Sequence, residues 1–262
     1  MATRQLITSK TISLFLIDTA SPVLARNALM ISMQRFEFDA VKVFTNTPEL
    51  YPGMECVKIR ELKSGFDYSN FTIKELPDYI ETDYILIMHY DGFILNGNEF
   101  SPTYFHYDYI GAPWMGDEVN SVGNGGFSWR SKKLCKAIQE LAIGEEDIGH
   151  EDAFICKIKR KILEDKYQCF FPSKEIALHF AFEAAPPRHP TFGFHGAFHL
   201  PLIFRNNIEH LLDHLPDRLF VESDPNCRFF RHHIGLLSED AVKLYDDRFS
   251  KRSAQAIINR GS

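Results

Sequence analysis

The chain has 262 residues, a length that suits one large domain or two small ones. Hydrophobic residues make up 45% and charged residues 24%, which is typical of a globular protein and argues against long disordered stretches. The formal net charge of −6 argues against a general electrostatic surface for nucleic acid, so we expect no nucleic-acid partner.

The sequence contains no apolar run near the roughly 20 residues that cross a bilayer, so we expect no transmembrane segment. The apolar stretch Ile12–Ile17 is short, and Asp18 interrupts it where the core of a secretory signal would continue. Five widely spaced cysteines without a C-x-x-C pair favour a reducing compartment over a disulfide framework or a zinc ribbon. We therefore expect a cytoplasmic protein, either free or peripheral at the membrane.

Strand and helix patterns alternate in the first part of the chain. An apolar, β-rich run covers Thr11–Asp18, and Ser21-Pro22 then begins a helix. A second helix, interrupted by Pro77, is predicted over Phe71–Ile80. Further strands are predicted at Val41–Thr45, Cys56–Ile59 and the almost continuously apolar Tyr84–Met88. This alternation predicts a mainly parallel sheet with right-handed crossovers.

Shorter elements follow residue 91. The strand candidates are Tyr107–Ile110, Gly126–Trp129 and Gln168–Phe171. The predicted helices are Lys132–Leu141, Glu151–Asp165, Asn207–His214 and Ser238–Tyr245. Because no repeat, linker or low-complexity tract divides the chain, we expect one α/β domain over residues 1–205. A helical C-terminal appendage, residues 206–262, is expected to pack on it.

The residues directly after the predicted strands are the first site candidates, because ligands of parallel sheets bind outside the carboxyl ends of the strands. They are Asp18-Thr19, Thr45-Asn46 and His89-Tyr90-Asp91. The period of two puts His89 and Asp91 on the same side of their strand. A carboxylate followed by Gly92 suits a hard divalent cation that carries a diphosphate, although Asp-Gly is also a common turn.

Three glycines lie within four positions in Gly123-Asn124-Gly125-Gly126. Such a run is costly unless the backbone takes a positive φ or lies against a ligand. The run lacks the spacing of a P-loop and of a Rossmann dinucleotide fingerprint. A ligand-contacting loop and a glycine hairpin that enters a strand both stay open.

Two further candidates lie downstream. His150-Glu151-Asp152 begins a predicted helix, where the macrodipole stabilises acids and where a carboxylate could also act as a general base. His195, in the irregular segment Gly193–Gly196, could reach a metal. His199 follows at the spacing of the H-E-x-x-H motif, but Gly196 stands where that motif has glutamate, so a zinc protease is not supported.

The order and wording of these motifs resemble one family. The segments that carry the resemblance are Phe71–Leu76, Thr82–Asn96, Tyr107–Trp114, Val122–Ser128 with Arg130-Ser131, His150–Asp152 with Ile155-Cys156, and Phe192–Gly196. They are similar to bacterial and viral glycosyltransferases grouped under the uncharacterised domain DUF5672, within the GT-A fold superfamily. The resemblance covers roughly residues 12–196 and implies a GT-A-like (Rossmann-like) mixed, mainly parallel sheet flanked by helices.

The resemblance implies a hexosyltransferase-like glycosyltransferase. Such an enzyme moves a sugar from a nucleotide-sugar donor, here expected to be UDP-linked, to a hydroxyl of a glycan, lipid-linked or protein acceptor. GT-A enzymes usually carry a D-x-D motif whose last Asp binds Mn²⁺ or Mg²⁺ on the donor diphosphate. Here the motif is His89-Tyr90-Asp91, so only the second acid is present and a strict metal requirement stays open. His195 matches the late histidine that often completes the metal shell.

The resemblance also implies roles for individual residues. Expected at the nucleotide-sugar donor are Asp18, Thr19, Asn46, Lys74, Asp91, Gly125 and Gly126. By likeness to the x-E-D motif, Asp152 is expected to be the catalytic base or acceptor anchor, with Glu151 next. Two alternatives stay open: a non-catalytic nucleotide-sugar or glycan-binding protein with a degenerate site, and a glycoside hydrolase, which also uses two carboxylates.

Overall fold

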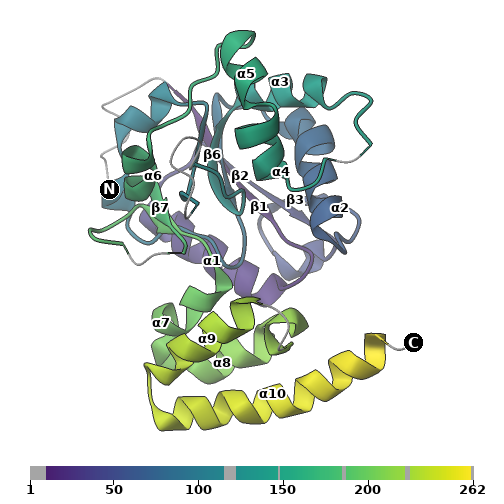
Figure 1. Cartoon of the computed structure of the whole chain (residues 1–262), viewed down its shortest axis with the longest axis vertical. Coiled ribbons are helices and arrows are strands. Elements are labelled where there is room, and N and C mark those ends of the chain that lie inside the picture. Colours follow the sequence, from purple (N-terminus) through teal and green to yellow (C-terminus); the bar gives the residue numbers. More distant parts are fainter. Residues whose placement is uncertain (1–9, 115–121, 147, 185–186, 222–224, 261–262) are drawn as a thin grey trace.

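A six-stranded sheet in the order β3-β2-β1-β4-β6-β5 forms the centre of the molecule (Figure 1). The structure, a computed structural model, describes residues 10–114, 122–146, 148–184, 187–221 and 225–260. The strands that pair in parallel are β1 (Ile12–Ile17), β2 (Ala40–Thr45), β3 (Glu55–Lys58) and β4 (Tyr84–Met88). Antiparallel pairs add β6 (Phe127–Ser131) and β5 (Tyr109–Gly111). The predicted α/β class with a mainly parallel sheet is confirmed.

Both faces of the sheet are covered, and β1 shows how the sequence achieves this. Every residue of β1 is buried, and successive side chains point to opposite faces. Leu14 and Leu16 pack in the core that includes helix α1 (Pro22–Arg35), whereas Phe15 packs in the second core, which includes Phe71. A strand that is apolar at every position except the buried Ser13 therefore has a partner on each side.

The predicted helices over Phe71–Ile80 and Glu151–Asp165 are interrupted. The first follows α2 (Gly65–Asn70) as a π-turn over Phe71–Glu75 and a 3₁₀ turn over Leu76–Tyr79. The second divides into α4 (Glu151–Ala153), a π-turn and α5 (Arg160–Asp165). Backbone N–H groups reach back five residues in both π-turns, from Leu76 to Phe71 O and from Lys159 to Phe154 O, the latter at 2.8 Å. Helix α3 (Lys132–Leu141) is confirmed over its full predicted range.

The strand predicted at Gln168–Phe171 is wrong: the structure describes this segment, and it is not a strand. Gln168 has a φ of +53°, which breaks the extended conformation. Asp108 N donates to Phe170 O at 2.7 Å, but Phe170 N donates to the Asp108 side chain instead of to a neighbouring backbone. A carboxylate thus takes the place of the second ladder bond that a strand would make.

A small parallel pair of strands was not predicted. Helix α6 (Lys174–Phe180) leads into β7 (Ala181–Phe182), which pairs with β8 (Gly193–Phe194). Directly after β8, Gly196 N donates to Asp91 O at 2.8 Å. This pair therefore brings the segment around residue 195 to the end of β4.

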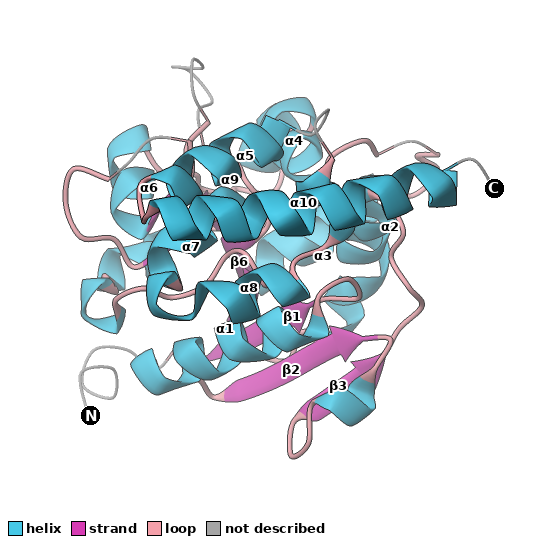
Figure 2. Cartoon of the chain, turned by 90° about the horizontal axis from the view of Figure 1, so that it is seen from below, coloured by secondary structure: helices cyan, strands magenta, loops and turns pink. Residues whose placement is uncertain are grey.

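A layer of helices packs beneath α1 (Figures 1 and 2). It contains α7 (Leu200–Ile203), α8 (Ile208–His214), α9 (Pro225–Gly235) and the long α10 (Glu239–Arg260). The layer meets α1 where Ser21 Oγ donates to His214 O at 2.7 Å. The helix predicted to end at Tyr245 continues to Arg260, and α9 was not predicted. The helices of the layer begin at Leu200, six residues before the predicted boundary. The domain boundary at residue 206 therefore stays a prediction.

The sequence led us to expect no transmembrane segment and no disulfide framework. None of its helices combines the length and the apolar character that crossing a membrane demands. All five cysteines carry free thiols, and four of them are buried. Burial raises the pKa of the Cys135 thiol to about 12, so this side chain packs in the core as an unreactive thiol.

Candidate active site

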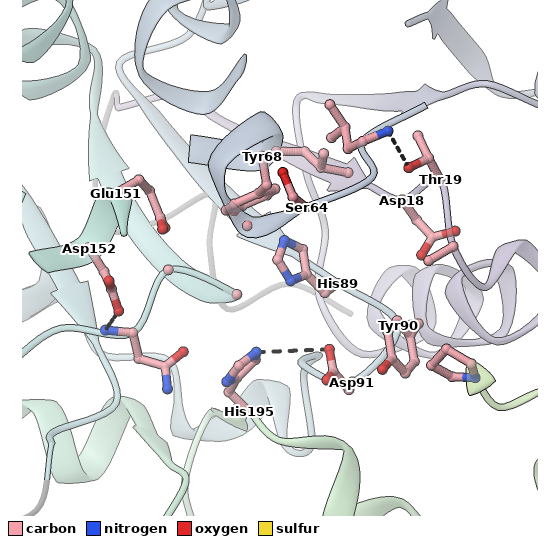
Figure 3. Close-up of a pocket in the computed structure, with 18 of the residues that line it drawn as sticks. Asp18, Thr19, Ser64, Tyr68, His89, Tyr90, Asp91, Glu151, Asp152 and His195 are labelled. Atoms are coloured by element: carbon pink, nitrogen blue, oxygen red, sulfur yellow. Dashed lines mark hydrogen bonds and ion pairs between the residues drawn. The ribbon is translucent and has the colours of Figure 1, made fainter. Parts of the chain in front are cut away.

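A cavity of about 570 Å³ opens at the carboxyl ends of β1 and β4 (Figure 3). Its walls come from separate parts of the chain. These include the residues after the two strands, the start of α2, the glycine-rich loop, the start of α4, the β7–β8 region and the helical layer. The lining residues are Ile17–Ala20, Leu62–Gly65, Tyr68, His89–Asp91, Trp114, Asn124–Gly126, Glu151, Asp152, Glu183, His195, Pro216 and Arg218. Most of the residues that the sequence marked as site candidates therefore meet at one place.

Three potential metal ligands lie together at the end of β4. One ligand atom each from His89, Asp91 and His195 lies within 4.8 Å of the other two. Asp91 is buried, and its Oδ1 lies 3.8 Å from His195 Nε2 (Figure 3). Asp91 and His195 are the two ligands expected from the resemblance, and the geometry adds His89.

The surroundings of His89 fit a ligand role. Burial lowers the pKa of His89 to about 3, so the imidazole is neutral and has a lone pair to offer. Its Nε2 is buried and has no hydrogen-bond partner among the described residues. A Cβ at Gly126 would lie 2.9 Å from His89 Nδ1 and 2.1 Å from His195 Nε2. Glycine at this position thus leaves open the space between the two imidazoles, where an ion would bind.

His195 is held in place by Glu183, a residue that sequence analysis did not single out. Glu183 Oε1 lies 3.0 Å from His195 Nδ1, which directs Nε2 toward Asp91. Burial opposes protonation of His195, but the hydrogen bond to Glu183 and the charge of Asp91 outweigh it and raise its pKa. A carboxylate behind a histidine is the usual means of orienting a metal-binding imidazole. No local motif marks Glu183, because only the β7–β8 pairing brings it here.

The two acids at the start of α4 have different surroundings. Glu151 is buried, and its Oε1 lies 2.9 Å from Nη2 of the equally buried Arg130. Burial raises the pKa of Glu151, and the positive charge of Arg130 partly offsets that effect. Asp152 is half-buried, and its Oδ2 accepts from Asn124 N at 3.0 Å (Figure 3). Both acids line the cavity, but the carboxylate of Glu151 is occupied by an ion pair, whereas Asp152 is the more exposed of the two.

A buried network fixes the glycine-rich loop. Arg130 Nε donates to Ser128 Oγ, which donates in turn to Gly125 O, both at 3.0 Å. A Cβ at Gly125 would lie only 1.4 Å from Glu151 Oε1, so a side chain there would have to displace the carboxylate that pairs with Arg130. Asn124 takes a positive φ of 65°. The loop thus lies against the cavity as backbone and not as a free glycine hairpin.

Asp18 and Thr19 lie across the cavity from Glu151 and Asp152 (Figure 3). Asp18 accepts from Ser21 N at 3.0 Å at the start of α1. Burial raises the pKa of Asp18 to about 7, although backbone hydrogen bonds act in the opposite direction. Thr19 Oγ1 accepts from Leu62 N at 3.0 Å and ties the loop before α2 to the end of β1.

Two expected donor-binding residues are not brought to the cavity. Lys74 Nζ donates to Glu145 O at 2.8 Å, and Asn46 follows β2, away from the lining residues. The two tryptophans also differ. Trp129 is buried and stacks on Tyr84 with 4.8 Å between ring centroids, whereas Trp114 lines the cavity.

The helical layer contributes a cation that sequence analysis did not mark. Arg218 Nη2 donates to Tyr90 OH at 3.0 Å and lies 3.6 Å from Asp91 Oδ2. Arg218 belongs to the 3₁₀ turn Asp217–Phe220, within the part of the chain that carries no recognised motif. The C-terminal layer is thus part of the cavity wall.

Fold and cavity together define an α/β protein with a candidate metal site at the carboxyl ends of a mainly parallel sheet. The family described as "Protein of unknown function (DUF5672)" matches residues 54–195, more than half of the chain. The chain belongs to this family, which confirms that part of the resemblance. No curated protein matches the sequence.

Solved structures offer partial likenesses. Glucosyl-3-phosphoglycerate synthase from Mycobacterium tuberculosis, in complex with Mn²⁺, uridine diphosphate and phosphoglyceric acid, is 10% identical with a TM-score of 0.33. The match covers 48% of this chain and 57% of that one. The bifunctional IspDF from Campylobacter jejuni is 10% identical with a TM-score of 0.36, over 55% of this chain and 46% of that one. The chain thus spans about half the length of these structures.

Proposed function

We propose that this protein is a glycosyltransferase that uses a nucleotide-sugar donor and a divalent metal to glycosylate a hydroxyl acceptor. One observation carries the proposal. A single cavity holds a cluster of three potential metal ligands, His89, Asp91 and His195, and a carboxylate, Asp152, anchored to the glycine-rich loop. A metal site and a separate candidate base are the two chemical functions that metal-assisted sugar transfer needs.

The charge of the cavity supports a metal-bound donor. Its carboxylates are Asp18, Asp91, Glu151, Asp152 and Glu183. The permanently charged cations among the described lining residues are Lys63 and Arg218. Arg130 neutralises Glu151, so the remaining carboxylates face Lys63, Arg218 and His195. A nucleoside diphosphate alone would therefore meet no net positive charge here, whereas the same diphosphate with a divalent cation would be attracted.

The ligand set favours Mn²⁺ over Mg²⁺. His89, Asp91 and His195 would hold the ion with two imidazole nitrogens and one carboxylate, and Mg²⁺ prefers oxygen ligands. When bound, the ion supplies positive charge for the diphosphate that leaves as the sugar is transferred. Asp91 would bind the same ion as the donor phosphates.

Asp152 is the residue that we assign to the acceptor. Its bond from Asn124 N fixes the carboxylate beside the glycine-rich loop, where it can take the proton of the incoming hydroxyl. Glu151 is unsuited to this role because Arg130 occupies its carboxylate. We assign Gly125 and Gly126, which would present only backbone, to the donor sugar, and Asp18 and Thr19 to the nucleoside.

Release of free nucleoside diphosphate tests the proposal. Purified protein is incubated with a panel of nucleotide sugars, UDP-linked ones first, with Mn²⁺ or with EDTA, and with or without hydroxyl acceptors. We expect release that depends on both metal and acceptor and is lost in Asp91→Asn. Asp165→Asn is the matched control, because Asp165 is an exposed acid paired with Lys161 on α5.

The other outcomes identify the alternatives. Binding of a nucleotide sugar without release under any acceptor condition would indicate a binding protein. Cleavage of a glycan without a nucleotide donor would indicate a glycoside hydrolase. Either result would contradict the transferase proposal.

A further inference from the structure

Arg218 faces the same carboxylate that the metal would use. Its Nη2 lies 3.6 Å from Asp91 Oδ2, while His195 Nε2 lies 3.8 Å from Asp91 Oδ1. Arg218 reaches this point from the helical layer, outside the segments that resemble the family. A guanidinium keeps its charge at every working pH, so a divalent ion bound at Asp91 would meet a fixed positive charge within a few ångströms.

The turn that carries Arg218 is anchored, and its side chain, which donates to Tyr90 OH at 3.0 Å, is half-exposed toward the cavity. Leu219 and Phe220 are buried, Tyr245 OH donates to Leu219 O at 3.1 Å, and Arg252 Nε donates to Asp217 Oδ1 at 2.9 Å. The Arg218 side chain itself is 54% exposed, against 6% for Asp91. The guanidinium therefore lines the cavity from an anchored backbone, within reach of a ligand bound next to Asp91.

We propose that Arg218 couples metal binding to diphosphate binding. Without an anion, its charge opposes a divalent cation at Asp91 and lowers the affinity for the metal. With a nucleoside diphosphate in the cavity, the guanidinium binds phosphate oxygens. Arg218 then stabilises the anion that holds the metal, and so favours binding of the pair. The inference rests on the proposed function, because it takes the anion to be the diphosphate of the donor.

Such coupling is reciprocal. If the diphosphate raises the affinity for the metal by some factor, the metal raises the affinity for the diphosphate by the same factor. Arg218 increases this factor from both sides, since it weakens the metal alone and strengthens the pair. Loss of the guanidinium should therefore shift the two affinities in opposite directions, which loss of a merely structural contact would not do.

Isothermal titration of wild type, Arg218→Gln and Arg218→Lys with Mn²⁺ alone, and with pyrophosphate in saturating Mn²⁺, tests the proposal. For Arg218→Gln we expect Mn²⁺ alone to bind about 3- to 10-fold more tightly and pyrophosphate about 10-fold or more weakly. Arg218→Lys keeps the charge without the bidentate geometry, so only pyrophosphate binding should weaken. Arg231→Gln is the control, because Arg231 is an equally exposed arginine of the same layer, paired with Asp246.

The remaining outcomes overturn the inference. If Arg218→Gln binds both probes like wild type, or if both affinities fall together, Arg218 does not couple them; nucleotide-sugar turnover by wild type would still stand. Wild type that binds neither Mn²⁺ nor Mn²⁺-pyrophosphate would overturn the metal-assisted transferase as well. Melting temperatures of all variants show whether each one is folded at the temperature of the titration.

Discussion

The guanidinium of Arg130 and the carboxylate of Glu151 form an ion pair of 2.9 Å in which both side chains are almost fully buried. Arg130 also donates to Ser128 Oγ, which holds the carbonyl of Gly125. The backbone N–H of Glu151 donates to Ser69 Oγ at 3.0 Å, which ties α4 to α2. The pair thus links β6, the glycine-rich loop and α4 beneath the cavity floor.

Substitution Glu151→Gln should destabilise the protein by about 3–5 kcal/mol, because it leaves the charge of Arg130 buried without a counter-ion. Chemical denaturation measures the free energy of unfolding. In the double variant Arg130→Met with Glu151→Leu we expect part of this loss to be recovered, since no buried charge is then left unpaired. A Glu151→Gln variant with wild-type stability and no turnover would instead assign Glu151 to the chemistry.

Substitution Asp152→Asn should reduce turnover by about 10²- to 10⁴-fold, the usual contribution of a general base. The amide oxygen can still accept from Asn124 N, so the loop and the affinity for the donor should change little. Steady-state kcat and a separate donor titration distinguish the two effects. Near-normal transfer by a folded Asp152→Asn variant would remove Asp152 from the role of base.

Substitution Gly126→Ala should weaken Mn²⁺ binding at least tenfold, because the added methyl group would occupy the space between His89 and His195. Titration with Mn²⁺ in the presence of pyrophosphate measures the effect. Gly235→Ala is the control, since a Cβ there would have no described heavy atom within 4 Å. Unchanged Mn²⁺ affinity in Gly126→Ala would place the metal elsewhere.

The central strands could be predicted from the sequence because their residues are mostly apolar, with few interruptions such as Ser13 in β1 and Lys42 in β2. Tyr84–Met88 matches β4 residue for residue, and Asp91 follows it at the cavity. The two-residue strands β7 and β8 could not be predicted, since no periodicity exists over so short a length. At Gln168–Phe171 a strand-like composition was overridden by a positive φ and by the carboxylate of Asp108.

The candidate site divides in the same way. Asp18, Asp91 and Asp152 follow strands or begin a helix, so local patterns mark them. Glu183 and Arg218 reach the cavity only through contacts between segments far apart in the chain, with Arg218 and Tyr90 separated by 128 residues. Lys74 was expected at the donor but does not line the cavity. Its position in the sequence before β4 did not reveal that its ammonium group would bind Glu145 O.

Burial of Asp18 should make the stability of the protein depend on pH between about 4 and 7. The pKa of Asp18 is raised from 3.8 to about 7 by burial in the folded protein, so in this window the folded state binds a proton that the unfolded chain releases. Stability contributed by this group is therefore greatest at low pH and falls as the pH rises toward 7. Asp18→Asn, which has no charge to bury, should gain stability relative to wild type at pH 8, on the order of 3 kcal/mol or less.

Urea denaturation of wild type and Asp18→Asn at intervals from pH 5 to 8, with EDTA present, measures the difference. Asp83→Asn is the contrasting control: hydrogen bonds from Thr11 lower the pKa of Asp83, so this acid is ionised in both states above pH 5. Its difference from wild type should stay constant over the same range, whereas the difference for Asp18→Asn should grow with pH. A constant difference for Asp18→Asn as well would show that Asp18 titrates near its ordinary pKa in the folded protein.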